Sequence, residues 1–337
     1  MRAHTKNTIL HPWCMGLILL FLLVFTVEGW LWRQGYRVAS DIVYTDGEPL
    51  HEFDPLCGWD NIPVSRRSAE DDSVWENVWP NGQRISRPSL DKPARWRALC
   101  IGDSMTFGIG VPDEETWVYR LNEHFPQIRF DNAGVPGTSS WQALLKLRRT
   151  LEASRYDLII YTSINAHLAR NAWYHVFFGD LQRNHAFYLT PRCELLANGE
   201  LKGYSCFPPS WWLDNYLIAP NFFKRAYIGR KVQADDPTLG TWTDDTVRLF
   251  YAVVSAMQKE VEAHGARFIL TTVEPELPAY FAQCPPEVEA VSLVYNDRGD
   301  PKYFVANNPA NHPNGLMHKE WARMLAGYLD KHPLEAR

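Results

Sequence analysis

The stretch RALCIGDSMTFGIG, residues 97–110, decides the fold of this chain. It opens with a short apolar run of the kind that forms a buried parallel strand, and Gly102 ends the run. Ser104 follows almost immediately. A serine at this point can expose its hydroxyl at the start of a helix, with its backbone N–H directed into the same space. The stretch therefore predicts a strand–turn–helix unit whose serine is either reactive or a helix cap.

Further strands and helices are predicted downstream, and they alternate. The strands are expected at 128–135, 156–164, 266–273 and 290–296, and the helices at 113–125, 140–153, 243–265 and about 314–329. Strands that alternate with helices of this length form a parallel sheet covered on both faces. We therefore expect a three-layer α/β/α sandwich, with its functional residues beyond the carboxyl ends of the strands.

Composition excludes several classes of protein. The chain has 337 residues, of which 46% are hydrophobic and 22% charged, so it is not disordered as a whole. A net charge of -5 argues against a nucleic-acid-binding protein, which needs a basic surface. A mean hydropathy of -0.31 excludes a polytopic membrane protein but leaves room for a single span.

A single span is predicted at the N-terminus. Residues 7–27 contain no Asp, Glu, Lys or Arg, and the apolar run reaches the roughly 20 residues that cross a bilayer. Trp13 lies on one side, and Trp30 and Trp32 lie on the other, as interfacial aromatic residues do. No small-residue cleavage site follows, which favours an uncleaved signal anchor over residues 1–32. A cleaved signal peptide or a buried core helix remains the alternative.

The basic residues beside the span are almost evenly divided between its two sides, so they do not decide the orientation. A short tail before the span and a large domain after it favour a cytoplasmic N-terminus. The body of the protein would then be extracytoplasmic, in a periplasmic position. Residues 33–94 show no sustained periodicity and are expected to form a membrane-proximal stalk that drapes over the main domain. Residues 95–337 are expected to form that α/β domain.

Three more chemically promising positions follow the first. Gly134 and Asn165 each lie in a loop at the end of a predicted strand, and His312 immediately precedes the last predicted helix. Together with Ser104 they supply a nucleophile, a base and donors for an oxyanion. No CxxC pair, HExxH, Walker or complete GxGxxG motif occurs, so we expect neither a metal nor another cofactor.

The order Gly-Asp-Ser, then Asn-x-Gly, then x-x-Asn, then a late His-Pro-Asn resembles the SGNH/GDSL hydrolase family, and in particular its membrane-anchored bacterial members. The resemblance covers roughly residues 95–335. It implies a flavodoxin-like fold, an ester substrate, Ser104 as nucleophile and His312 as base. It also implies an oxyanion hole made by the Ser104 and Gly134 N–H groups and the Asn165 amide.

The chain departs from that family in its acid. The family usually carries an acid two or three residues before the histidine, where this chain has Ala310 and Pro309. Either Asp297 or Asp300 substitutes, or a backbone carbonyl orients His312 in a dyad, or activity is lost.

Other polar residues near these motifs have simpler interpretations. Asp103 is expected to hydrogen-bond locally, and His167 and His318 are expected to be structural. Asn198-Gly199 predicts a hairpin turn between Cys193 and Cys206. Simple register pairs Cys193 with Tyr204, so a disulfide to Cys206 would need a bulge.

An insertion over about 171–240 is rich in Trp, Tyr and Phe and directly follows the Asn165 loop. It is expected either to cover the site or to form a second small core. The sequence thus predicts a membrane-anchored serine acyl-ester hydrolase of the cell envelope, acting on an acyl ester that belongs to a lipid or an acylated glycan. Two alternatives stay open: an O-acetyltransferase of an envelope polysaccharide, and a catalytically retired binding module. The sequence does not determine the oligomeric state.

Overall fold

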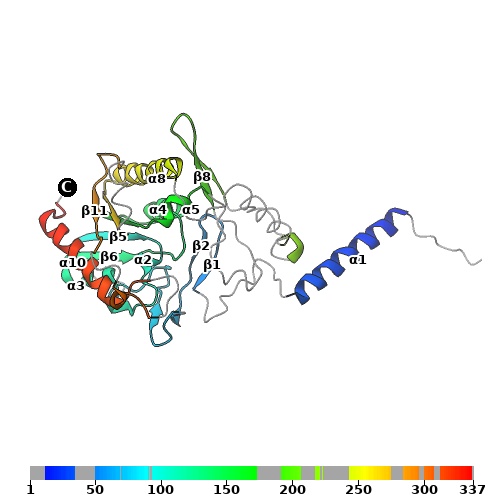
Figure 1. Cartoon of the computed structure of the whole chain (residues 1–337), viewed down its shortest axis with the longest axis horizontal. Helices are drawn as coiled ribbons and strands as arrows, with labels where there is room; N and C mark the ends of the chain where they lie inside the picture. Colours follow the sequence, from blue (N-terminus) through cyan, green and yellow to red (C-terminus); the bar gives the residue numbers. More distant parts are fainter. Residues whose placement is uncertain are drawn as a thin grey trace, which may run out of the picture.

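A parallel sheet forms the centre of the computed structural model, which describes residues 12–34, 50–68, 70–89, 91, 93–172, 191–205, 217–220, 222, 243–274, 284–295, 300–306 and 312–335. The five strands are β5 (Trp96–Gly102), β6 (Ile128–Asn132), β7 (Leu158–Ser163), β10 (Arg267–Thr272) and β11 (Ala290–Ser292). They lie in the order β11-β10-β7-β5-β6, and every neighbouring pair is parallel (Figure 1). This is the flavodoxin-like order, in which the chain reverses direction across the sheet between β5 and β7.

Helices cover both faces of the sheet. One face packs against α4 (Ser140–Ala153) and α8 (Asp244–Ala263), and the other against α3 (Trp117–His124) and α10 (Gly315–Lys331). Alternate strand residues divide between the two cores: Leu99 and Ile101 belong to the first, Ala98 and Cys100 to the second. The predicted three-layer sandwich is confirmed, and all five strands lie within the predicted ranges to within one residue.

Helix α1 (Pro12–Arg33) lies apart from the sandwich in Figure 1. Among the helices in the described ranges, α1 is the one that is long and apolar enough to cross a membrane. Its most apolar window has a mean hydropathy of 2.2. Its less exposed side chains are Val24, Val27, Glu28 and Leu31, which share one face. The carboxylate of Glu28 accepts hydrogen bonds from the N–H groups of Ile218 and Ala219, at 2.6 and 2.8 Å, so this face of the helix touches the insertion.

Residues 50–91 form two small antiparallel sheets, β1 (His51–Asp54) with β2 (Gly58–Asn61), and β3 (Ser65–Arg67) with β4 (Trp75–Asn77). This part therefore contains short strands where the sequence shows no sustained periodicity. The segment packs on the sandwich: the Trp59 indole N–H donates to the Pro136 carbonyl at 3.0 Å, and the Asn61 amide donates to the Gly134 carbonyl at 2.8 Å. Short-range periodicity is absent because each strand is only three or four residues long.

The described part of the insertion contains the predicted hairpin, β8 (Arg192–Leu195) with β9 (Leu201–Tyr204), and Gly199 has a φ of +83° in the turn. Cys193 pairs with Gly203, one position away from the predicted register, and its thiol is buried and free. Cys206 and most of the aromatic residues of the insertion lie outside the described residues.

Candidate active site

Ser104 lies where strand β5 ends, at the first position of the short helix α2 (Ser104–Phe107). The Asp103 side chain caps this helix by accepting the Met105 N–H at 3.1 Å, and Gly108 ends it in the left-handed region with a φ of +84°. The sharp entry and exit hold the serine at the carboxyl edge of the sheet, with 8% of its surface exposed.

His312 reaches Ser104 from the loop before α10. Its Nε2 lies 2.9 Å from Ser104 Oγ, although the two residues are 208 positions apart. The loop is held on both sides of the histidine: the Val305 N–H donates to the His312 carbonyl at 2.9 Å, and the Asn314 side chain caps α10. The predicted pairing of Ser104 with His312 is thus present as a hydrogen bond.

The other ring nitrogen of His312 contacts a residue that the sequence did not suggest. His312 Nδ1 lies 2.5 Å from Glu70 Oε1. The two acids proposed from the sequence do not take this place. Asp300 is an exposed cap of the 3-10 helix η4 (Pro301–Tyr303), where its carboxylate lies 3.0 Å from Lys302 Nζ, and Asp297 lies outside the described residues.

Glu70 sits in the loop between β3 and β4, and a buried ion pair anchors that loop. The Glu70 N–H donates to Ser68 Oγ at 3.3 Å. Glu76 on β4 is fully buried, pairs with Arg66 at 2.7 Å, and accepts the Gly110 N–H at 2.9 Å. Burial would raise the pKa of the Glu76 carboxyl, but Arg84 and Arg66 outweigh it, and the pKa lies below its usual value. The loop that carries Glu70 is therefore fastened to the turn that follows Ser104.

Arg84 makes the second connection between the N-terminal segment and this turn. Its guanidinium is fully buried, lies 2.7 Å from Asp113, and donates to the carbonyls of Gly108 at 2.9 Å and Val111 at 2.7 Å. A planar fork with five donors can satisfy several acceptors at fixed angles, which an ammonium cannot do. Leu50 and Val78 also pack with Phe107 and Ile109 in a small apolar cluster.

The predicted oxyanion donors differ in their availability. The Ser104 N–H starts α2, and no acceptor for it is found in the described part of the chain. The Gly134 N–H donates to Asn132 Oδ1 at 3.1 Å.

Gly134 has another reason to be glycine. A Cβ at this position would lie 2.4 Å from the Phe107 nitrogen and 2.9 Å from the Thr106 carbonyl carbon. The absence of a side chain therefore lets the loop after β6 pack directly on the backbone of α2, which carries Ser104.

Asn165 lies at the end of β7, as expected, and precedes α5 (Ala166–Arg170). Its backbone N–H donates to the carboxylate of Glu274, which follows β10. Glu274 thus ties the loop of the predicted amide donor to the next strand along the sheet.

Asp103 and His167 have structural roles, as predicted. Asp103 is fully buried, and besides capping α2 it lies 3.4 Å from Arg170. Burial raises the pKa of Asp103, and burial together with the Arg170 charge lowers the pKa of His167 well below its usual value. His167 Nδ1 accepts the Ile164 N–H at 3.3 Å and lies 2.9 Å from the Tyr161 hydroxyl, so this histidine is a neutral part of the core.

His318 is also structural, as predicted. Its Nδ1 accepts the Trp117 N–H at the start of α3, at 3.2 Å, and its ring is fully buried. Burial and the charges of Arg84 and Arg120 lower its pKa to about 3, so it joins two helices as a neutral ring.

No family model and no curated protein matches the sequence. Among solved structures, the chain is similar to a lipolytic protein of the G-D-S-L family from Veillonella parvula, with 11% identity over 70% of this chain and 98% of that one and a TM-score of 0.39. It is also similar to the psychrotrophic esterase EstA from Pseudoalteromonas (15%, 69% and 98%, TM-score 0.40) and to an acetyl-xylooligosaccharide esterase from Geobacillus (13%, 74% and 100%, TM-score 0.37). Similarity this remote transfers no residue roles, so the roles of Ser104, His312 and Glu70 must follow from their own geometry.

Proposed function

We propose that the protein is a serine acyl-ester hydrolase of the SGNH/GDSL type that works through an acyl-enzyme on Ser104. One observation carries the proposal: Ser104 Oγ, the two ring nitrogens of His312 and the Glu70 carboxylate form one hydrogen-bonded chain, with separations of 2.9 and 2.5 Å. A serine, an imidazole and a carboxylate in this order are the recurring arrangement for activating a hydroxyl nucleophile.

The two contacts of His312 support one placement of the protons. With its hydrogen on Nδ1, His312 donates to Glu70 and keeps the lone pair of Nε2 for the Ser104 hydroxyl proton. Ser104 Oγ attacks the ester carbonyl carbon as Nε2 takes that proton, and Glu70 stabilises the imidazolium that forms. The Ser104 N–H and the Asn165 side-chain amide are the donors for the oxyanion, which leaves the Gly134 N–H in its bond to Asn132.

The remaining steps use the same groups. Collapse of the tetrahedral intermediate breaks the ester C–O bond, and the imidazolium returns its proton to the leaving alcohol. Water then gives a proton to Nε2 as it attacks the acyl-enzyme, and the carboxylic acid departs with Ser104 restored. Every proton taken by His312 is returned, so the cycle needs no cofactor.

Glu70 also bears on the alternative of a retired binding module. That alternative rested on the missing acid before His312, and Glu70 supplies a carboxylate at the required nitrogen. We further propose that α1 is a signal anchor that holds the domain outside the cytoplasmic membrane, with an ester of the cell envelope as substrate. Water or a glycan hydroxyl could accept the acyl group, and product analysis with an acyl donor and a glycan acceptor separates hydrolase from O-acetyltransferase.

A fluorophosphonate probe tests the acyl-enzyme directly. The full-length protein in detergent should be labelled on Ser104, as mass spectrometry of the labelled peptide would show, and Ser104→Ala should lose labelling and esterase activity together. His312→Ala should slow labelling strongly while the melting temperature changes little. Full esterase activity in Ser104→Ala would refute the proposal, and so would labelling of another residue.

A further inference from the structure

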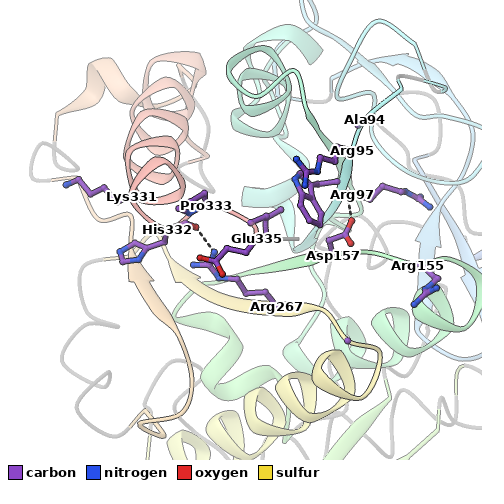
Figure 2. Close-up of a pocket in the computed structure, with 13 residues that line it drawn as sticks. Ala94, Arg95, Arg97, Arg155, Asp157, Arg267, Lys331, His332, Pro333 and Glu335 are labelled. Atoms are coloured by element: carbon purple, nitrogen blue, oxygen red, sulfur yellow. Dashed lines mark hydrogen bonds between the residues drawn. The ribbon is translucent and has the colours of Figure 1, made fainter. Parts of the chain in front are cut away.

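A large cavity lies at the edge of the sheet opposite to Ser104. Its volume is about 1070 Å³, and it is formed where β5, β7 and β10 begin and where α10 ends. Figure 2 shows Arg95, Arg97 and Asp157 on one side, Lys331 and His332 on the other, and Arg267 between them. We call it the amino-edge groove; its lining consists of Ala94, Arg95, Trp96, Arg97, Arg155, Asp157, Gly265, Arg267, Lys331, His332, Pro333, Leu334 and Glu335.

The amino-edge groove is basic, although the chain as a whole carries a net charge of -5. Five cationic side chains line it against the two carboxylates of Asp157 and Glu335. Arg97 lies 3.3 Å from Asp131, and Arg267 lies 2.5 Å from Glu289. The positive charges of these two arginines are therefore paired with carboxylates outside the groove lining. Within the described ranges no ion pair is found for the other three, which are Arg95, Arg155 and Lys331. These three charges are available to an anion.

The groove also has a rigid floor. The Arg97 N–H donates to the Asp157 side chain at 2.8 Å, and the Arg267 N–H donates to the Asp157 carbonyl at 2.9 Å. The Arg267 guanidinium donates to the His332 carbonyl at 2.6 Å, which ties the end of α10 to the sheet. A ligand would therefore contact side chains whose backbone is already held in place, which reduces the conformational entropy lost on binding.

The remaining lining groups fit a saccharide. The Arg95 guanidinium lies over the Trp96 ring, 5.0 Å from its centre, so this contact holds a cation at the groove. Carboxylates such as Asp157 and Glu335 accept hydrogen bonds from sugar hydroxyls, while Arg and Lys bind carboxylate or phosphate groups. A volume near 1070 Å³ lies just above the range for small-ligand pockets, about 300–1,000 Å³, and suits a short oligosaccharide.

We propose that the amino-edge groove is a binding site for an acidic saccharide, distinct from the reaction centre. A bilayer surface fits less well, because the groove is concave and because α1 and the C-terminal end of the chain lie at opposite ends of the molecule in Figure 1. The groove binds the anionic units of a polymer, and the hydrolytic site at the other edge of the sheet is not needed for this binding.

The test is calorimetric titration of the full-length protein in neutral detergent with a tetramer of galacturonic acid. The triple variant Arg95→Ala, Arg155→Ala, Lys331→Ala should weaken binding about tenfold or more and reduce its dependence on salt, because screened charge–charge contacts are lost. A matched triple, Arg248→Ala, Lys319→Ala, Arg323→Ala, removes the same charge from exposed positions outside the groove and should stay within about twofold of the wild type.

Three outcomes would overturn the proposal. They are no binding of the acidic tetramer, equal binding of a neutral maltotetraose, and equal binding by the groove variant and the wild type. Groove-dependent binding to anionic phospholipid vesicles without binding to the tetramer would assign the site to a membrane instead. Hydrolysis of p-nitrophenyl acetate should be unchanged in the groove variant. A failure of saccharide binding and a failure of the proposed esterase activity are therefore separate results.

Discussion

Replacement of Glu70 is the sharpest test of the proposed chemistry, because Glu70 was not identified from the sequence. In Glu70→Ala, His312 loses the carboxylate that lies 2.5 Å from its Nδ1. Both side chains are largely buried, with exposed fractions of 18% for Glu70 and 14% for His312, so solvent screens the pair only partly. In the variant, formation of the imidazolium in the transition state should require more free energy.

The magnitude follows from the charges. Two unit charges about 4 Å apart interact by about 4 kcal/mol at an effective dielectric constant near 20. Loss of that interaction in the transition state corresponds to roughly a thousandfold decrease in kcat. Glu70→Gln should be at least as slow, at about 10³- to 10⁴-fold, because its amide N–H can donate to Nδ1 and stabilise the wrong tautomer. Glu70→Asp keeps the charge but shortens the side chain, and should fall between the wild type and the alanine variant.

The assay is the initial rate of p-nitrophenyl acetate hydrolysis by the full-length protein in detergent, with the melting temperature as a control for folding. Asp300→Asn is the matched control. It removes the exposed carboxylate of Asp300, one of the two acids that the sequence suggested as the partner of His312. Its rate should stay within about twofold of the wild type, as for a surface pair. The reasoning fails if Glu70→Gln keeps more than a tenth of the wild-type kcat, or if Asp300→Asn is as slow as Glu70→Ala.

Three further predictions concern the surroundings of the site. Gly134→Ala should lower kcat about tenfold or more and destabilise the fold by roughly 1–3 kcal/mol, because its Cβ would meet the backbone of α2 at 2.4 Å; wild-type rates and melting temperature would contradict this. Arg84→Lys should lower the melting temperature by about 5 °C or more, since one ammonium cannot serve Asp113 and two carbonyls; calorimetry measures it, and an unchanged value would refute the bracing role. His318 has a pKa of about 3 in the fold against an ordinary value near 6.5, so the unfolded chain binds the extra proton between these values and stability falls as pH falls through that window. The variant His318→Asn keeps an acceptor for the Trp117 N–H, and its free energy of unfolding should fall by about 1.4 kcal/mol less per pH unit in this window than that of the wild type. If the melting temperatures of both proteins fall equally with pH, the assignment to His318 is wrong.

Much of the fold follows from the sequence because it depends on local patterns. Each apolar run that was expected to form a strand does so, since its side chains alternate between two cores, and the helices begin at residues that cap them, such as Ser139 and Thr243. The positions of Ser104 and His312 follow as well, because strand ends and helix starts place them at the carboxyl edge of the sheet.

The acid did not follow, for a physical reason. Glu70 lies 242 residues before His312, next to Asp71 and Asp72, and no spacing or periodicity connects it with the histidine. Its place depends on the Glu76 carboxylate, which accepts the Gly110 N–H, and on the buried Arg84–Asp113 pair. These contacts hold the N-terminal segment against the turn after Ser104, and they form only when segments far apart in the sequence pack together.

What the sequence by itself determined is therefore the set of strands and helices of the sandwich, together with the serine and the histidine that lie at their ends. Local side-chain periodicity and capping encode these features within a few residues. What only the tertiary structure decided is the carboxylate on His312, the engagement of the Gly134 N–H by Asn132, and the basic groove at the opposite edge of the sheet. Each of these depends on which distant loops the packing brings together, and no local pattern records that.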